Sequence, residues 1–243
     1  MKRIDIVFEV ETHADVCLVR ICNEPVNAIG FAGWADFVDL IQRLDQGDAG
    51  CLVITGLPGR HFCAGNDFKE FRTLDKTGAR RGSGIVKEVT RVLRESRKVS
   101  IAALHGSALG SGLMLASACD IRVASRDAFI GLPEVNVNAF GGYRMVRDVL
   151  GIGEARLLTL TGEPMPIARG HALGFVQRLY DSHDELLSGA LALGQTIAEK
   201  TRGILRERVK DCLNRTDAAS LWDGFEVEME LGADVMAAAS GKT

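Results

Sequence analysis

The chain has 243 residues, of which 47% are hydrophobic and 25% are charged, so it can bury the core of one domain, or of one domain with a small appendage. Its formal net charge is -3 and it contains no basic block, which argues against nucleic acid or a membrane surface as partner. No signal-peptide pattern and no bilayer-spanning apolar stretch are present. The six cysteines form no CxxC pair. We therefore expect a cytoplasmic globular protein with reduced core cysteines.

The first third of the chain mixes strand and helix patterns. Apolar runs or alternating apolar residues predict strands at 4–10, 15–21 and 51–55. Apolar residues at helical spacing predict a helix at 31–44. A short helical turn is expected at 68–71. Residues 73–84 are polar and rich in glycine, which predicts a mobile flap, and an amphipathic helix follows at 85–96.

Residues 100–124 form the segment around which the rest of the chain is organised. An apolar strand over 100–104 runs into a tight turn at His105 and Gly106, and an apolar helix over 110–119 ends at Asp120 before a strand at 121–124. Glycines allow a backbone to approach a ligand closely, and a helix start presents unpaired N–H groups with the positive end of the helix dipole. This terminus suits an oxygen that carries developing negative charge. His105 and Asp120 are expected to be structural.

The remainder of the chain turns from mixed elements to helices. The patterns predict a strand at 128–130, helices at 146–150, 154–161 and 165–173, and then helices only, at 185–200, 203–213 and 217–238. Thr216 or Asp217 is the expected cap of the last helix. The chain is thus divided into an α/β core over 1–183 and a C-terminal helical region over 184–243.

Three motifs are candidates for chemistry, and each has a simpler interpretation. The segment CLVITGLPGRHFCAGNDFKEF at 51–71 ends a strand in a glycine-bearing loop, a common surface turn. Gly110-Ser111-Gly112 is neither a dinucleotide fingerprint nor a P-loop and can serve close packing alone. Glu134 follows Leu132-Pro133, and a lone loop glutamate is usually solvated. His61 is expected to be exposed. No GxSxG elbow and no metal-ligand spacing occur.

Taken together and in order, the motifs carry a resemblance. The segments NEPVNAI, FCAGNDFKEF, ALHGSALGSGLMLASACDIRVAS, FIGLPEVNV and LTGEPM…HALGFVQRL resemble the crotonase (enoyl-CoA hydratase/isomerase) superfamily along about the whole chain. The resemblance implies an α/β spiral of ββα units, with a C-terminal helical region that mediates trimer packing. It also implies an acyl-CoA thioester substrate and no metal or redox cofactor.

The resemblance also implies roles for individual residues. The backbone N–H groups of Asn66 and Ser111 would hold the thioester oxygen, and Glu134 would move the proton. Two preorganised donors of this kind stabilise an enolate by several kcal/mol, about 3 to 4 for one donor. The segments that line CoA in the family match these positions here: Val26, Ala28, Ala64, Asp67 and Phe68.

One departure from the family decides the expected reaction. Family hydratases carry a glutamate three residues after the middle glycine of the helix-start motif, where this chain has Met114. A thioether cannot move a proton, whereas one carboxylate is enough to shift a double bond. We therefore expect an enoyl-CoA isomerase whose acyl chain packs near Met114. The alternatives are a hydratase, a decarboxylase or a thioester hydrolase that uses Glu134 alone, and a non-catalytic acyl-CoA-binding subunit.

A second departure is the loop at 135–143, which is shorter than in the family. Its polar residues Asn136, Asn138 and Tyr143 are interpreted as turn residues of a surface loop rather than as pocket residues. The last helix carries a set of apolar residues that predict a homotrimer or hexamer: Leu221, Trp222, Phe225, Met229, Leu231 and Val235.

Overall fold

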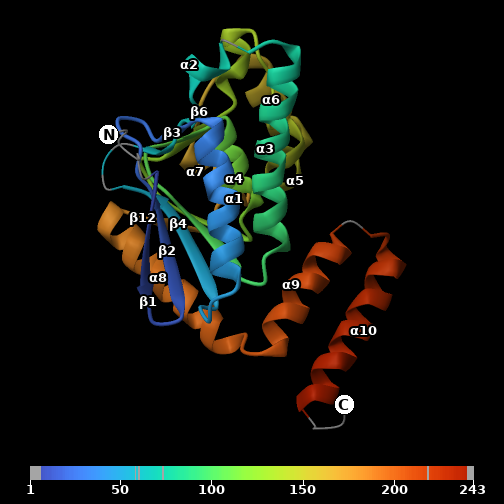
Figure 1. Ribbon diagram of the computed structural model, residues 1–243. Helices are drawn as coiled ribbons and strands as arrows, with labels where there is room; N and C mark the ends of the chain where they lie inside the picture. The colour runs from blue at the N-terminus through green and yellow to red at the C-terminus, as the bar shows by residue number, and fades with distance from the viewer. Residues whose placement is uncertain (1–6, 58, 60, 73, 218, 240–243) are drawn as a thin grey trace.

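A six-stranded sheet forms the centre of the molecule (Figure 1). The computed structural model describes residues 7–57, 59, 61–72, 74–217 and 219–239. In sheet order the strands are β1 (Phe8–His13), β2 (Val16–Ile21), β4 (Cys51–Gly56), β7 (Val99–Leu104), β9 (Ile121–Ser125) and β12 (Arg178–Tyr180). β1 and β2 form an antiparallel hairpin, and the other neighbours are parallel. The strands expected at 4–10 and 15–21 correspond to β1 and β2, but the first begins at Phe8 and extends to His13, and residues 4–6 lie outside the described part of the chain.

Short strands form two smaller sheets beside the first. The four-stranded sheet runs β11 (Met165–Pro166), β10 (Phe129–Gly131), β8 (Ser107–Leu109) and β5 (His61–Cys63), and the two-stranded sheet pairs β3 (Ala28–Ile29) with β6 (Gly65–Asn66). β5 and β8 are parallel neighbours, and so are β8 and β10. This pairing brings the segments that follow these strands together at one place, and those segments carry the three candidate motifs.

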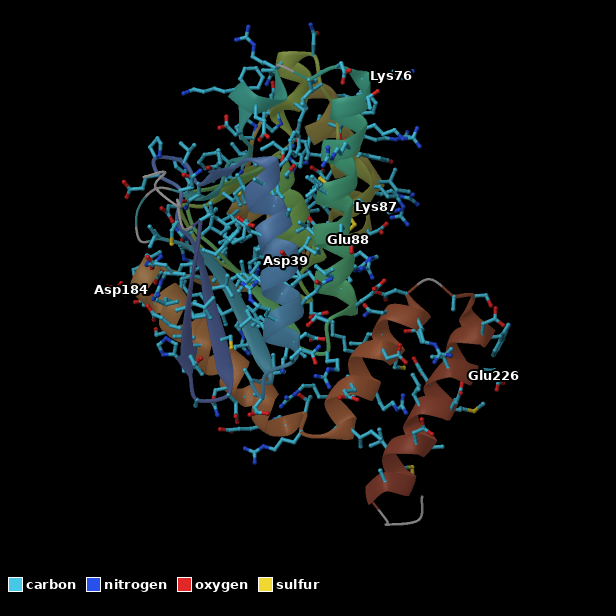
Figure 2. The ribbon with its side chains drawn as sticks, viewed as in Figure 1. Asp39, Lys76, Lys87, Glu88, Asp184 and Glu226 are labelled. Carbon is cyan, nitrogen blue, oxygen red and sulfur yellow. The ribbon has the colours of Figure 1, made fainter. Side chains whose placement is uncertain are left out.

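Helices cover both faces of the central sheet. On one face lie α1 (Phe31–Asp45), α3 (Lys76–Glu95) and α4 (Ser111–Ala118), and on the other lies α8 (His183–Lys200). Strand β4 shows why both faces of the sheet are apolar. Its successive side chains alternate between the faces, so Leu52 and Ile54 pack in the hydrophobic core on the α1 side, whereas Cys51 and Val53 pack in the core on the α8 side. The outer faces of α1, α3 and α8 carry labelled charged residues such as Asp39, Lys87 and Asp184 (Figure 2).

The other helices connect the sheets or extend from them. They are α2 (Phe68–Phe71), the 3-10 helix η1 (Pro133–Val137), α5 (Tyr143–Leu150), α6 (Ile152–Thr161), α7 (Ile167–Ala172), α9 (Ile204–Thr216) and α10 (Leu221–Ala239). α9 and α10 form a helical hairpin that stands away from the sheet (Figure 1). Within the described residues, no helix is both long and apolar enough to cross a membrane.

One buried lysine fastens this hairpin to the core. Lys210 of α9 is 3% exposed, and its Nζ donates to the carbonyl oxygens of Leu93 and Lys98 at 3.1 and 2.7 Å. It also lies 2.9 Å from Oδ2 of Asp120, which accepts from the backbone N–H and hydroxyl of Ser100. The structural role expected of Asp120 is thus confirmed.

The predicted flap at 73–84 is wrong. α3 begins at Lys76, and Asp75 caps it by accepting from the N–H of Gly78 at 2.7 Å. Gly82 is buried against α1, where an added Cβ would overlap the Phe31 ring. Glycine content was therefore misleading, because this glycine permits close helix packing. Residue 73 lies outside the described part of the chain.

Two helix boundaries also differ from expectation. The helix expected at 165–173 begins only at Ile167, because Met165 and Pro166 pair with β10 as strand β11. Neither Thr216 nor Asp217 caps the last helix, because Thr216 ends α9 and Asp217 is the C-cap residue of α9. α10 begins at Leu221, after Ser220, whose hydroxyl accepts from the N–H of Asp223 at 3.4 Å.

The six cysteines are free thiols, as expected. Four are buried, namely Cys17, Cys51, Cys63 and Cys119. Burial raises the pKa of the Cys51, Cys63 and Cys119 thiols to about 12, so these groups stay protonated and unreactive at neutral pH.

Candidate active site

Glu134 lies in the first turn of η1, directly after β10, and it faces the start of α4. A Cβ placed on Gly110 would lie only 2.7 Å from Oε1 of Glu134, so the carboxyl lies directly over that glycine. The other oxygen, Oε2, is buried and has no hydrogen-bond partner among the described residues. Burial away from water raises the pKa of the Glu134 carboxyl, and a hydrogen bond with its own backbone opposes that rise. A half-buried carboxyl with one buried, unpaired oxygen and a raised pKa is typical of a group that moves protons.

The start of α4 and the strand β6 meet beside this carboxyl. Gly110 adopts φ 54° and ψ -124°, and its N–H donates to the carbonyl of Gly131 at 3.0 Å. A Cβ on Gly65 would lie 3.0 Å from the backbone nitrogen of Ser111, the first residue of α4. Asn66, the residue after Gly65, is therefore next to a helix N-terminus whose first N–H groups have no intrahelical acceptor. The role of the Asn66 and Ser111 N–H groups as a pair of donors stays a prediction.

A cavity of about 260 Å³ opens at this place. It is lined by Ala64, Asn66, Phe68, Gly110, Pro133, Glu134, Asn136, Val137 and Ala139. Four of the predicted site residues, Glu134, Asn66, Ala64 and Phe68, thus share one cavity. Glu134 is the ionisable side chain of this described lining, and the others are apolar or amides.

Three other predicted residues, Val26, Ala28 and Asp67, are not part of the described lining of this cavity. The carbonyl of Val26 accepts from the N–H of Ala64 at 3.0 Å, and Ala28 pairs with Gly65 in the small sheet. Asp67 caps α2 by accepting from the N–H of Lys69 at 2.8 Å. Their predicted contacts with CoA stay predictions.

Met114 also lies outside the cavity lining. A Cβ on Gly142 would lie 3.1 Å from Cγ of Met114 and 2.8 Å from Cδ2 of Leu132, so the thioether side chain packs under the start of α5. Its backbone N–H closes the first turn of α4 by donating to Gly110 at 3.0 Å. The position therefore holds an apolar packing group, and the described lining offers Glu134 no second carboxyl.

The 135–143 loop is only partly what the sequence indicates. Asn136 was interpreted as a surface-turn residue, but it is both exposed and part of the cavity lining. Its Nδ2 donates to the carbonyl of Gly162 at 3.4 Å. Asn138 ends η1 in the left-handed conformation at φ 57°, as a turn residue does, and Tyr143 packs against the core. The polar pattern of a short loop does not reveal which of its side chains faces inward.

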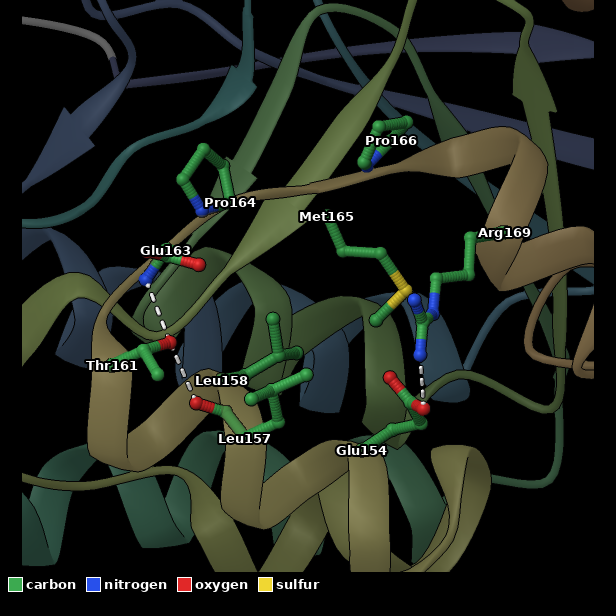
Figure 3. A pocket seen from close by; sticks show the side chains of 9 residues that line it. All are labelled: Glu154, Leu157, Leu158, Thr161, Glu163, Pro164, Met165, Pro166 and Arg169. Carbon is green, nitrogen blue, oxygen red and sulfur yellow. Dashed lines mark hydrogen bonds and ion pairs between the residues drawn. The ribbon is translucent and has the colours of Figure 1, made fainter.

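A second hollow, of about 140 Å³, lies between α6 and the segment around β11 (Figure 3). Its lining shares no residue with the first cavity. Glu154 and Arg169 face each other across it, with Oε1 and Nη2 2.6 Å apart. These opposite charges pair with each other, and none of the motif residues considered for chemistry is part of this described lining.

The histidines do not add an acid or base to the site. His105 is 2% exposed, its Nε2 lies 3.1 Å from the carbonyl of Leu57, and burial lowers its pKa to about 4. It is thus neutral at pH 7 and structural, as expected. His61 is half-buried rather than exposed, and its Nδ1 lies 2.6 Å from the hydroxyl of Ser107. No His, Cys, Asp and Glu cluster that could hold a metal occurs among the described residues.

Comparison with known proteins gives one consistent family. A model of the family described as enoyl-CoA hydratase/isomerase matches residues 11–242. A probable enoyl-CoA hydratase of Bacillus subtilis (strain 168) is 34% identical over 196 residues, which cover 76% of this chain and 74% of that protein. A peroxisomal Delta(3,5)-Delta(2,4)-dienoyl-CoA isomerase of Arabidopsis thaliana is 29% identical over 198 residues, with 74% and 71% covered.

Larger relatives and solved structures agree with this result. The chain spans only 23% and 27% of two fatty acid beta-oxidation multifunctional proteins, from Arabidopsis thaliana and Brassica napus, at 33% and 30% identity. The structure of Pseudomonas aeruginosa DspI superposes with a TM-score of 0.90 at 30% identity, covering 95% of this chain and 89% of that one. An enoyl-CoA hydratase from Thermoplasma volcanium GSS1 gives 0.87 at 27% identity, covering 95% and 92%. The predicted crotonase-like fold is confirmed.

Proposed function

Because the chain belongs to the enoyl-CoA hydratase/isomerase family, we propose that it binds an enoyl-CoA thioester and shifts its double bond. The observation that carries this proposal is the half-buried carboxyl of Glu134, unpaired at Oε2, in the cavity at the start of α4. Among the described residues the carboxyl has no competing ion pair, and the described lining offers no second acid or base. A single proton shuttle fits a reaction that removes one proton and returns it.

The proposed reaction is a balanced transfer of one proton. Glu134 takes a proton from C2 of a 3-enoyl thioester, and the electron pair moves onto the thioester oxygen to give a dienolate. The backbone N–H groups of Asn66 and Ser111 hold that oxygen, with the positive end of the α4 dipole behind them. Return of the proton from Glu134 to C4 restores the carbonyl and leaves the double bond between C2 and C3. The step needs no metal and no redox cofactor.

Met114 is the reason that hydration is not the first choice. Addition of water is served by two groups, one that holds or deprotonates the water and one that serves the carbon. The thioether of Met114 can do neither, and it is packed against Leu132 and Gly142. Decarboxylation or hydrolysis of a thioester with Glu134 alone is the alternative within this fold, and a binding protein without catalysis is the alternative outside it.

The test is one incubation with a matched variant. A 2-enoyl-CoA and a 3-enoyl-CoA are mixed with the protein in heavy water, and the products are followed by mass spectrometry. We expect double-bond migration and deuterium uptake without gain of water. Glu134→Gln keeps the shape of the side chain and should lower the rate about 100- to 10,000-fold, because it removes the proton carrier. Water addition as the main product, or full activity of Glu134→Gln, would refute the proposal.

We also propose that the protein assembles as a homotrimer or as a hexamer of two trimers. The support is the outer face of α10, where Trp222, Phe225 and Met229 are 74, 50 and 59% exposed. An apolar face of this kind is typical of a surface that another subunit covers. Sedimentation at micromolar concentration should give a trimer or hexamer mass, and a monomer mass would contradict the proposal.

A further inference from the structure

Two hydrogen bonds join the segment that carries Asn66 to the first turn of α1. Trp34 of α1 is fully buried, and its indole Nε1 donates to Oδ1 of Asn66 at 2.8 Å. The backbone N–H of Phe31, the first residue of α1, donates to Oε2 of Glu70 in α2 at 2.8 Å. An indole N–H can only donate, and here its acceptor belongs to the residue whose backbone N–H is a proposed oxyanion donor.

The backbone N–H of Asn66 lies outside the pairing of β6 with β3. The N–H of Asp67, the next residue, donates to the carbonyl of Ile29 in β3 at 3.0 Å. Successive N–H groups of a strand point to opposite sides, so the N–H of Asn66 points away from β3. No further strand pairs with β6 in the part of the chain that the structure describes. The sheet thus leaves this donor unused, and a pairing of only two residues holds it weakly.

We propose that Trp34 is a positioning residue for the oxyanion donor. Its indole N–H holds the side chain of Asn66, and this bond keeps the backbone N–H of Asn66 aimed at the thioester oxygen. The inference rests on the proposed function, in which that N–H is one of two donors. Trp34 is not part of the described cavity lining, so it acts through Asn66 rather than on the ligand.

The anchor is rigid because the tryptophan is packed in the core. Trp34 belongs to the hydrophobic core on the α1 side of the central sheet, and its ring meets that of Phe37 edge-on, with the centroids 6.5 Å apart. Donors that are held in place before the reaction stabilise an oxyanion most, because they need no reorientation as the charge develops. A bond that only satisfied a buried indole would contribute to stability alone. The two roles therefore differ in their effect on kcat.

The experiment measures kcat and KM for a 3-enoyl-CoA in two variants of α1. Trp34→Phe keeps a buried ring and removes the indole donor. It should lower kcat about 10-fold and leave KM within about twofold, since the donor stabilises the oxyanion far more than the substrate carbonyl. Ile41→Ala is the control, because Ile41 is buried further along α1 and its truncation lowers stability without removing a hydrogen bond. The kcat of this control should match that of the wild-type protein.

A double-variant cycle separates action through Asn66 from action elsewhere. Asn66→Ala removes the acceptor of the indole and keeps the backbone N–H, so it should also lower kcat about 10-fold. Trp34→Phe in the Asn66→Ala background should add no further loss, whereas independent effects would multiply to about 100-fold. Proton NMR gives a second reading, because the indole resonance of Trp34 should shift in Asn66→Ala while that of Trp222, the other tryptophan of the chain, stays in place.

The outcomes separate this inference from the proposed function. If the wild-type protein moves the double bond but Trp34→Phe keeps the wild-type kcat, the inference alone is overturned. The same holds if Ile41→Ala loses as much kcat as Trp34→Phe, if the two losses multiply in the double variant, or if the Trp34 resonance does not shift in Asn66→Ala. If the wild-type protein does not move the double bond, the proposed function fails and the inference fails with it.

Discussion

Gly110→Ala is the substitution that most directly tests the position of Glu134. The added methyl carbon would lie 2.7 Å from Oε1 of Glu134, whereas ordinary van der Waals contact begins at 3.4 Å. The carboxyl must therefore retreat by roughly 0.7 Å, and displacement of a catalytic group by about 1 Å can cost about 100-fold in rate. We expect the isomerisation rate to fall about 10- to 100-fold.

The same substitution also strains the backbone, because φ at Gly110 is 54°. This strain should lower the free energy of unfolding by about 1 to 3 kcal/mol, or the melting temperature by about 2 to 12 °C. Gly203→Ala is the control for backbone strain alone. Gly203 precedes α9 with φ 58° and ψ -139°, and nothing lies within 4 Å of a carbon added there. Both variants should lose similar stability in urea, but only Gly110→Ala should lose rate. Equal rates in the two variants would refute the placement of the carboxyl.

Four further results are expected. Lys210→Met leaves the Asp120 carboxylate without its ammonium partner, so it should lower the free energy of unfolding in urea by about 3 to 5 kcal/mol; a loss below about 1 kcal/mol would contradict the buried pair. Met114→Glu should not create a hydratase, because the new carboxyl would face Gly142, and measurable hydration of a 2-enoyl-CoA would show otherwise. The pH profile of kcat/KM should fall on its acidic side with a midpoint above the ordinary carboxyl value of 4.5, since burial raises the pKa of Glu134 and the base must be ionised. Because the pKa of Glu134 is raised in the folded protein, its ionised carboxyl destabilises the fold above pH 4.5. Glu134→Gln should therefore unfold at a higher urea concentration than the wild-type protein at pH 7. This difference should vanish at pH 3, where the carboxyl is protonated in both the folded and the unfolded state.

Periodicity explains which parts of the fold were predictable. β2, β4 and β7 are six-residue apolar strands, and α1 repeats apolar residues at helical spacing over four turns, so pattern alone locates them. β3 and β6 have two residues each, too few to show any period. The start of α3 was missed because its glycines resemble a loop until the packing of Gly82 on α1 is known.

The candidate site shows the same division. The family resemblance implied that Glu134, Asn66 and Ser111 act together, and the structure places the first two in one cavity and the nitrogen of the third 3.0 Å from a Cβ placed on Gly65. The bond from Trp34 to Asn66 could not be foreseen, because an apolar period marks Trp34 only as a core residue. The inward face of Asn136 depends on how a short loop folds over Gly162, and composition does not report this.

The buried ammonium of Lys210, one of several contacts between α9 and the core, has a consequence for how the molecule opens. The Lys210 ammonium contacts three acceptors of the core. A partial separation of α9 from the core would leave this charge with neither its acceptors nor full hydration, which is unfavourable. The amides of α9 and α10 should therefore exchange with deuterium as one cooperative unit, at a lower free energy than those of β4 and β7. The helical hairpin would then be a separate foldon, whose detachment leaves the cavity around Glu134 intact.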